Sequence, residues 1–551
     1  MFFSFGLLFL VEGQAQVVVQ IGQNFTGSTY GVNTQALPAD ANGAVGPRHF
    51  VEFINGTVAV YLKTNGLSVQ RKTNLKFWAD AGLIISTDSD VTDPRVIYDP
   101  VSQRWFASQV DFDANAAANG LDPTLEANDF LLAVSAGPDP TGPWHGFLFQ
   151  ADPDTGYFAD FPTLGVDGNG VYISGDLFHG QDTPVGPALV SLPKADLIAA
   201  TPTIANRTWF GVMSYSSRGQ VLQPAICFDG SSSGAVLAMG DIGSDSDPHS
   251  NVVNFTVQNS GSAAATLSAP LSIGVDPYVV PFNSDMGVPL FNPVQPDGTT
   301  TLQANDARLS AKVYAVGGVL YAVHSTEVNN RIAIRWYRID ASTRALIESG
   351  TITDPNLDLF FPSIAANAGG VVVIGYNGSS LGTFVSSFAI AGQTANGVTT
   401  FGNPVLLQSG VASYHDGNEI LAQLLDDPVV DSRWGDYSAT SVDPADPTRF
   451  WTIQMYPSDV DLSVGIGVWS TQITELLTTL PAPQLVIARA GTNVMVSWPI
   501  SASSYQLLTA TNLVPPVAWS NVTQVPATNG NVISSLVPVS GRQQFFRLFH
   551  P

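Results

Sequence analysis

Residues 163–174 read TLGVDGNGVYIS, two short apolar segments joined by the turn Asp167-Gly168-Asn169-Gly170. Gly and Asn readily adopt the positive φ that a tight turn between antiparallel strands requires, so this stretch predicts a β-hairpin. The same phrase recurs at 45–61, 95–107, 225–238, 313–322, 363–374 and 437–453. Seven copies at intervals of roughly 50 to 90 residues predict an all-β fold, a seven-bladed β-propeller with four-stranded blades. A pair of β-sandwiches is the alternative, because each phrase is also an ordinary hairpin.

The composition excludes several classes of protein. Hydrophobic residues make up 45% of the 551 residues, which excludes global disorder, whereas charged residues make up only 12%. The formal net charge of −24 repels phosphate backbones, so we expect no nucleic-acid partner. The acidity itself indicates either solubility or binding of a divalent cation by some of the carboxylates.

The ends of the chain differ in character from its middle. An apolar run from Phe2 to Val11, followed by the small residues of Gly13-Gln14-Ala15, predicts a cleavable export signal at residues 1–16, with a buried strand as the alternative. We therefore expect a secreted protein, extracellular or periplasmic, with no membrane span. The propeller is expected at 17–478, where the apolar residues from Val17 to Ile21 predict a first strand that completes the last blade. A Pro-rich linker at 479–483 precedes six or seven short strands at 484–551, which predict a small β-sandwich.

Charged and aromatic residues stand just before the first strand of most predicted blades. In a propeller these positions meet at one mouth of the central channel, where ligands bind. The predicted ligand-binding residues are Asp93, Arg95, Asp160, Phe161, Arg308, Phe361, Arg433, Asp436 and Tyr437. Aromatic rings that stack on a sugar, beside carboxylates and guanidiniums that bind its hydroxyls, would suit a carbohydrate. The structural alternative is that the Asp residues cap turns and that the Arg residues pack on neighbouring rings.

No motif identifies a reaction. The chain has no Gly-x-Ser-x-Gly elbow, no His-Glu-x-x-His and none of the sequence boxes of sialidases, and Cys227 is its only cysteine. No cofactor is expected, with calcium as a weak possibility. The stretches that suggest calcium alternate acidic residues with others, at 88–90, 111–113 and 241–247, but none follows the EF-hand pattern.

Two parts of the chain resemble known proteins. Residues 44–456 resemble a group of exported bacterial β-propeller proteins that are largely uncharacterised, through the phrases Asp93-Pro94-Arg95, Phe361-Pro362-Ser363 and Arg433-Trp434-Gly435-Asp436-Tyr437-Ser438. In that group a Gln-Glu-Tyr typically follows the last phrase, whereas this chain has Gln454-Met455-Tyr456. The tail from Pro483 contains Ser497-Trp498-Pro499, Tyr505-Gln506-Leu507 and a closing Phe545-Phe546-Arg547-Leu548. Through these phrases it resembles the fibronectin type III-like modules that end many exported proteins of Verrucomicrobia and related bacteria. The resemblance implies a fold and a compartment, but no reaction.

The leading hypothesis from the sequence is a secreted, non-catalytic propeller that binds a glycan or another extracellular polymer at the channel mouth. The main alternative is a polysaccharide-degrading enzyme, a glycoside hydrolase or a lyase, that uses Asp93, Asp160 or Asp436 as acid and base. A second alternative is a structural protein of the cell envelope. The sequence gives neither the ligand nor the oligomeric state.

Overall fold

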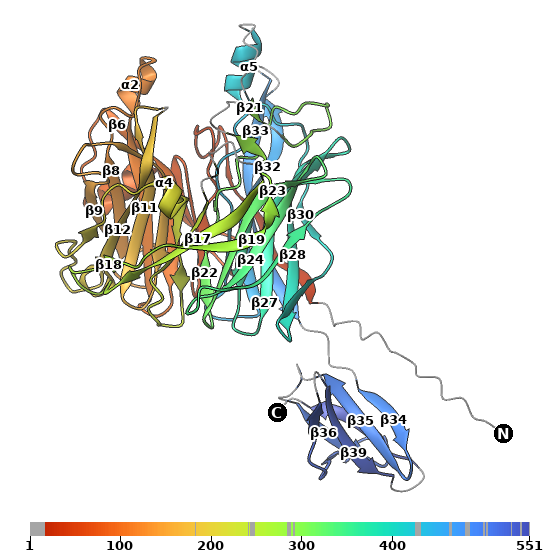
Figure 1. Cartoon of the computed structure of the whole chain (residues 1–551). Helices are drawn as coiled ribbons and strands as arrows, with labels where there is room; N and C mark the ends of the chain where they lie inside the picture. Colours follow the sequence, from red (N-terminus) through yellow and green to blue (C-terminus); the bar gives the residue numbers. More distant parts are fainter. Residues whose placement is uncertain are drawn as a thin grey trace. The chain divides into compact units, whose positions relative to one another are not determined.

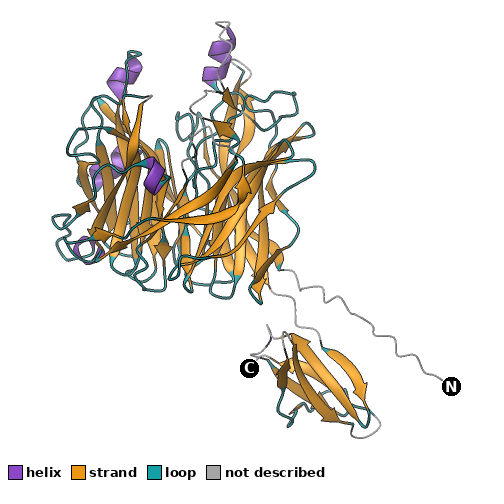
Figure 2. Cartoon of the chain, viewed as in Figure 1, coloured by secondary structure: helices purple, strands orange, loops and turns teal. Residues whose placement is uncertain are grey.

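The computed structural model describes residues 17–181, 183–240, 242, 248–283, 288–289, 292–424, 431–461, 465–479, 485–499, 502, 505–529, 532–539 and 543–549. In this part of the chain nearly all regular structure is β-strand, as predicted (Figure 1; Figure 2). The chain divides into two compact units. The larger comprises Val19–Ala391 and Asn403–Thr478, and the smaller comprises the remaining residues.

Apart from one two-stranded ribbon, the described strands from β1 to β33 form seven sheets of four or five strands, numbered here in chain order. Sheet 1 contains β2 (Gly43–Val45), β3 (His49–Ile54), β4 (Thr57–Leu62) and β5 (Ser68–Lys72). Sheet 2 contains β6 (Ser89–Asp99), β7 (Arg104–Asp113), β8 (Asp129–Ser135) and β9 (Trp144–Gln150). Sheet 3 contains β10 (Phe158–Val166), β11 (Gly170–His179), β12 (Thr183–Pro193) and β13 (Thr208–Trp209).

The other four sheets follow the same plan. Sheet 4 contains β14 (Gln220–Pro224), β16 (Ala235–Met239), β17 (His249–Gln258), β18 (Thr266–Leu267) and β19 (Leu271–Tyr278). Sheet 5 contains β15 (Ile226–Cys227), β22 (Tyr314–Val316), β23 (Val319–Val328), β24 (Arg331–Asp340) and β25 (Leu346–Ile352). Sheet 6 contains β26 (Asp358–Ala366), β27 (Val371–Ser380), β28 (Thr383–Ala395), β29 (Val398–Phe401) and β30 (Val405–Gln408). Sheet 7 contains β31 (Ala439–Val442), β32 (Arg449–Asp461), β33 (Ile466–Thr479) and β1 (Val18–Thr29).

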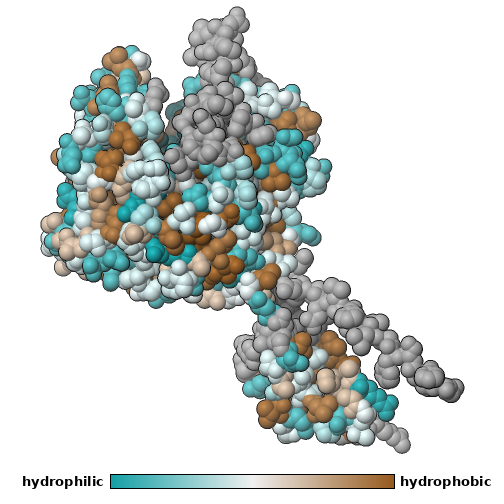
Figure 3. Space-filling view, in the orientation of Figure 1, coloured by the Kyte–Doolittle hydropathy of each residue, from teal (hydrophilic) through white to brown (hydrophobic). Residues whose placement is uncertain are grey.

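A two-stranded ribbon of β20 (Phe282–Asn283) and β21 (Val288–Pro289) lies outside these sheets. The helices in the described residues are short: α1 (Asn74–Asp80), α2 (Ala114–Ala118), α3 (Lys194–Leu197), α4 (Tyr215–Arg218) and α5 (Gly417–Leu424). None of the described helices has the length and apolar character needed to cross a bilayer. On the face seen in Figure 3, hydrophilic residues cover most of the larger unit, and hydrophobic ones gather around the long strands β17 and β19.

The first strands of the sheets contact one another in a closed cycle. β2 contacts β6, β6 contacts β10, and β10 contacts β14; further along, β22 contacts β26, β26 contacts β31, and β31 returns to β2. Between sheets 4 and 5 the connection is β15, which pairs in parallel with β22. Most of the buried side chains lie between neighbouring sheets, as in the cluster that includes Trp434, Trp451 and Trp469.

The predicted first strand does join the last sheet. β1 pairs with β33, so sheet 7 combines the beginning and the end of the larger unit. The fully buried carboxylate of Glu52, on β3, lies where β1 meets sheets 1 and 7. It accepts hydrogen bonds from the backbone N–H (3.1 Å) and hydroxyl (2.7 Å) of Ser28, from the hydroxyl of Tyr61 (2.7 Å) and from that of Thr471. Hydrogen bonds to the buried carboxylate of Glu52 therefore hold β1 in place, although β1 is distant in sequence from its partner β33.

Acidic residues at the turns between the first two strands of sheets 2, 3 and 7 link these sheets to their neighbours. Lys194 of sheet 3 forms a buried ion pair of 3.0 Å with Asp99 of sheet 2. Asp167, in the turn of the quoted hairpin, accepts from the N–H of Gly234 at 2.8 Å. Lys63, which follows β4 of sheet 1, forms an ion pair of 2.6 Å with Asp443 of sheet 7. This pair links the first and the last sheet of the cycle.

One predicted hairpin is wrong in detail. The phrase at 225–238 was expected to pair its two apolar segments, but the strand that pairs with β16 is β14, whose Gln223 stands opposite Leu237. The backbone then leaves sheet 4: the N–H of Ala225 still donates to Ala235, whereas that of Ile226 donates to Val313. The apolar run contributes to two sheets in succession, and in the sequence such a run cannot be told from a single continuous strand.

The smaller unit has its own core. β34 (Val486–Ala490), β35 (Asn493–Pro499), β39 (Val532–Pro538) and β38 (Ala527–Asn529) form one sheet, and β37 (Ser520–Asn521), β36 (Gln506–Ala510) and β40 (Phe545–Phe549) form another. Trp498, Leu507 and Ile533 belong to the buried cluster of this unit. The predicted export signal and all but the first residue of the predicted linker lie outside the described residues.

Candidate functional site

Four of the seven sheets carry the same irregularity in their first strand. In β6, β10, β14 and β26 the pairing register shifts by a β-bulge, and the bulged residue has a positive φ: Asp93 (60°), Phe161 (52°), Val221 (49°) and Phe361 (47°). Non-Gly residues rarely adopt this conformation, and bulges of this kind re-aim side chains beside functional sites. Because the same strained conformation recurs in four sheets, these bulges indicate a candidate site along the first strands.

Six charged side chains, two on first strands and four on the segments between strands, gather at this position, and we call them the entrance cluster. They are Asp40, Asp93, Asp160, Arg308, Arg433 and Asp436. Arg433 donates to Asp436 at 2.8 Å, and the backbone N–H of Asp436 donates to Asp40 at 2.9 Å. Arg308 forms a two-point contact with Asp306, 2.8 and 2.7 Å long, and its charge acts on Asp160 and Asp436.

The members of the entrance cluster differ in their access to solvent. The side chain of Arg433 is 46% exposed, and those of Arg308 and Asp436 are 21% and 15% exposed. Asp160 is half-buried, and among the described residues its carboxylate receives no hydrogen bond. Asp40 and Asp93 are buried. The open surface of the cluster thus presents two carboxylates and two guanidiniums, one of the carboxylates with its hydrogen-bonding capacity unused.

Burial and mutual repulsion change how these carboxyl groups ionise. Burial, reinforced by the charges of Asp93 and Asp436, raises the pKa of Asp160 to about 7, although Arg308 and Arg433 oppose the shift. The pKa of Asp40 lies well above its ordinary value because of burial and the same two acidic neighbours. The cluster therefore holds protonated carboxyl groups near neutral pH, a common property of functional sites.

The aromatic residues predicted for the site lie beneath it. Phe161, Phe361 and Tyr437 are buried, with 2%, 3% and 3% of their surfaces exposed. The rings of Phe161 and Tyr437 meet edge to face with centroids 4.8 Å apart, and the guanidinium of Arg95 lies 3.6 Å from the centre of the Tyr437 ring. These rings cannot stack on a sugar at the entrance. They support the charged cluster instead, as the packing alternative from the sequence anticipated for arginine.

Hydrogen bonds hold this supporting layer in place. The hydroxyl of Tyr437 donates to Asp93 at 2.7 Å. Arg95, which is 1% exposed, donates to the carbonyls of Pro162 (2.8 Å) and Ser310 (2.9 Å) and so crosses between sheets. Side chains anchored in this way from several sheets form a rigid base for the entrance cluster.

The structure thus brings the sequence-predicted residues into one region, in two layers. Asp160, Arg308, Arg433 and Asp436 reach the open surface, whereas Asp93, Arg95, Phe161 and Tyr437 lie below. Phe361 is the residue least involved, because it packs in the core between sheets 6 and 7.

Sequence reasoning missed four polar residues of this region. Asp40, which has a positive φ of 50°, stands in Ala39-Asp40-Ala41 without the Asp-Pro signal used elsewhere. Asn305 donates to Asp436 at 2.7 Å, and Asn55 donates to Asp40 at 2.7 Å and accepts from the N–H of Asp93. Asp176, whose pKa burial raises to about 7, accepts from the N–H of Val221. No motif surrounds these residues, and only their place in the repeat would have indicated them.

The acidic stretches considered for calcium have other roles where the structure describes them. Asp113 caps α2 by accepting from the N–H of Ala116, and Asp111 accepts from that of Asp129. Among the described residues no group of three or more His, Cys, Asp or Glu side chains is arranged to hold a metal ion. The stretch 241–247 lies, apart from Ile242, outside the described residues.

Comparisons with known proteins do not identify the chain. Searches found no matching family model and no match among curated proteins. A solved protein of unknown function from Dyadobacter fermentans is 10% identical, covering 83% of this chain and 97% of its own, with a TM-score of 0.34. The quinohemoprotein alcohol dehydrogenase of Comamonas testosteroni is 12% identical, covering 81% and 68%, with a TM-score of 0.35. The exo-β-1,3-galactanase of Phanerochaete chrysosporium is 13% identical, covering 84% and 100%, with a TM-score of 0.30. Scores this low support no argument about fold or function.

Proposed function

We propose that this chain is an exported β-propeller that binds a glycan or a similar hydroxyl-rich polymer at the entrance cluster. In this proposal the seven sheets are the blades of the propeller, and the smaller unit is a fibronectin type III-like sandwich that serves as a spacer or a second contact. The cyclic contacts of the first strands and the pairing of β1 with β33 support the seven-bladed arrangement. The resemblance to exported bacterial propellers supports the compartment.

The observation that carries the binding proposal is the open surface of the entrance cluster. Asp160 offers a carboxylate with free acceptor positions, and Arg433 and Arg308 offer N–H donors close by. Sugar hydroxyls both donate and accept, so a surface that alternates carboxylates with guanidiniums matches them better than it matches an anionic polymer. The net charge of −24 and the additional buried carboxylates oppose a phosphate backbone.

A glycan array with the purified protein, run with and without EDTA, tests the proposal directly. For a glycan found in this way, Arg433→Gln should weaken binding about 10- to 100-fold, since a hydrogen bond to a charged group contributes about 1.5–3 kcal/mol. Arg48→Gln is the matched control, because Arg48 is exposed and precedes β3, away from the entrance cluster. An array without hits would favour the structural alternative, and equal losses for both variants would contradict the assigned site.

A second candidate, hydrolysis of a polysaccharide, is favoured by one observation. A carboxyl group with a pKa of about 7, Asp160, lies in the electrostatic field of Asp436, which accepts from Arg433 and Asn305. Glycosidases use such a pair, with the protonated group as general acid and the ionised group as base or nucleophile. We propose Asp160 as the acid and Asp436 as its partner in this alternative.

The two candidates separate in a reducing-end assay on any glycan that binds. Binding without product supports the binding protein. Product that disappears in Asp436→Asn, with the affinity for the glycan retained, supports the hydrolase.

A further inference from the structure

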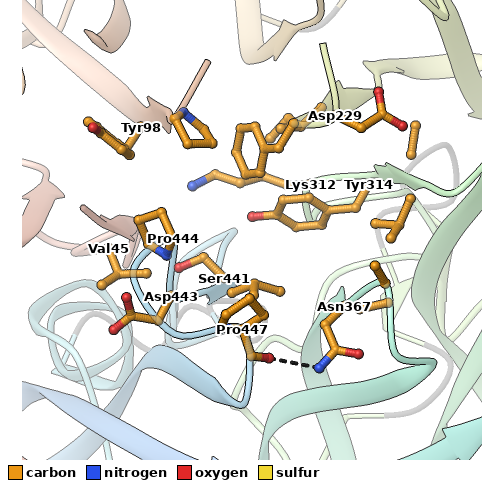
Figure 4. A pocket seen from close by; sticks show the side chains of 18 of the residues that line it. Val45, Tyr98, Asp229, Lys312, Tyr314, Asn367, Ser441, Asp443, Pro444 and Pro447 are labelled. Carbon is orange, nitrogen blue, oxygen red and sulfur yellow. Dashed lines mark hydrogen bonds between the residues drawn. The ribbon is translucent and has the colours of Figure 1, made fainter. Parts of the chain in front are cut away.

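A cavity lies at the ends of the first strands that are farther from the entrance cluster, and we call it the turn-side pocket. It has a volume of about 350 Å³ and is lined by the ends of β2, β6, β15, β22, β26 and β31 and by residues of the turns that follow. Five of the seven sheets therefore contribute to it. Its lining includes the side chain of Val45 and the rings of Tyr98 and Tyr314, which Figure 4 labels. Ile97, Ile226 and Phe228 add further apolar surface.

The turn-side pocket is distinct from the entrance cluster. On β6 the entrance residue Asp93 and the pocket residue Tyr98 are five positions apart, about 17 Å at the usual rise of a strand. Buried polar side chains fill the region between them. Arg95 donates to Pro162 and Ser310, as described above, and Gln223 donates to the carbonyl of Leu309 at 2.6 Å. A ligand of one site would therefore not contact the other.

The turn-side pocket contains one unusual group, Lys312. Its side chain lies beside the ring of Tyr314, with the nitrogen directed toward the middle of the residues drawn in Figure 4. The amine donates to the carbonyls of Gly43 (2.9 Å) and Val96 (2.7 Å), and the residue is only 5% exposed. No described carboxylate lies within ion-pair distance of this nitrogen. Burial, with a smaller effect from Arg95, lowers the pKa of Lys312 to about 7.

Below about pH 7 Lys312 is an ammonium with three N–H groups, so its two hydrogen bonds leave it with further capacity to donate. A charged acceptor must give up its strongly bound water before it enters a buried site, whereas a neutral acceptor gives up less. A hydrogen bond from a buried donor therefore favours a neutral acceptor. An anion would meet the carboxylate of Asp229, beside Asp443, whose charge Lys63 already pairs, and a cation would meet Lys312 itself. An uncharged molecule avoids both penalties, and the three rings favour an aromatic one.

We propose that the turn-side pocket binds a compact, uncharged aromatic molecule whose carbonyl oxygen accepts a hydrogen bond from Lys312. The rings of Tyr98, Phe228 and Tyr314 contact the aromatic body. The cavity volume is in the range of small-molecule sites in proteins.

The probe for the test is 6-propionyl-2-(dimethylamino)naphthalene, a neutral aromatic ketone whose emission shifts to the blue in apolar surroundings. The full chain should bind it saturably with one site. Ala368→Trp, which adds a ring at an exposed position of the pocket lining, should weaken this binding at least 10-fold. Ala118→Trp is the matched control, because Ala118 is exposed on α2 and does not line the pocket. It should leave the affinity unchanged.

The role of Lys312 is tested with a second probe, 2-(dimethylamino)naphthalene, which lacks the carbonyl. Lys312→Met should weaken binding of the ketone about 2- to 10-fold, the equivalent of one ordinary hydrogen bond, and leave the affinity for the second probe unchanged. Equal affinity of Ala368→Trp and wild-type protein for the ketone would overturn the pocket assignment. Equal losses of both probes in a folded Lys312→Met protein would overturn the hydrogen bond. Should Lys312→Met fail to fold, the Ala368→Trp titration still decides the assignment.

Discussion

Replacement of Asp160 by Asn should make the folded protein more stable near neutral pH. The pKa of this carboxyl group is raised from an ordinary 3.8 to about 7, first by burial and then by Asp93 and Asp436. A difference of about 3 pKa units corresponds to about 4 kcal/mol at a pH where the group is ionised in both states. Because the side chain is half-buried, water screens part of this cost, and we expect a gain of about 2 to 4 kcal/mol at pH 8.

The size of the effect depends on pH. Below about pH 4 the carboxyl group is protonated in both the folded and the unfolded protein, so the substitution should change little. Between about pH 4 and pH 7 the unfolded chain loses this proton while the folded chain keeps it, and the wild-type protein loses stability as the pH rises. The Asn variant should lack the part of this loss that Asp160 contributes, while other buried carboxyl groups such as Asp176 still add theirs.

Urea unfolding at pH 4.5 and pH 8, followed by tryptophan fluorescence, measures both quantities. Asp154→Asn controls for the loss of one negative charge, since Asp154 is exposed. A variant that is no more stable than wild type at pH 8, or that gains equally at both pH values, would refute the reasoning. At pH 8, where Asp160 is ionised, the same variant should bind a glycan less tightly, because it loses a charged acceptor at the open surface of the entrance cluster.

Three further substitutions test the fold. Glu52→Ala should lower the free energy of unfolding by about 3–5 kcal/mol in urea titrations, because four buried donors lose their acceptor; a loss below about 1 kcal/mol would contradict its role in holding β1. Lys194→Met should cost about 3 kcal/mol by leaving Asp99 unpaired, and the double variant with Asp99→Asn should recover part of the loss in the same titration. Gly165→Ala should cost about 1–3 kcal/mol, because an added Cβ would lie 2.6 Å from the carbonyl oxygen of Pro224; unchanged thermal melting would show that sheets 3 and 4 can separate there.

The turns were the most predictable part of the fold, because their chemistry is local. Asp-Gly, Gly-Gly and Asn-Gly sequences need no distant partner to favour a tight turn, and six of the seven predicted hairpins pair as expected. The seventh failed because the run from Ala225 to Phe228 serves two sheets, and a sequence does not show where a strand changes partners.

The sequence predicted most residues of the candidate site, but not which of them reach the surface and which are buried. The repeat placed Asp93, Asp160 and Asp436 at equivalent positions, and the structure brings their charges together. Whether a side chain there points to solvent or into the core depends on the bulge in each first strand, and a bulge leaves no clear mark in the sequence. Phe161 was therefore expected to contact a sugar, but it packs beneath Arg308 and Arg95 instead.

The pairing of β1 with β33 has a consequence for how the protein matures. Synthesis produces β1 before any other strand of the larger unit and its partner β33 after all of them, so about 440 residues separate the two strands. Until β33 is complete, the backbone groups of β1 lack their partner strand, and an edge of sheet 7 stays open to other chains. We therefore expect the chain to be more prone to aggregation before β1 and β33 pair than after.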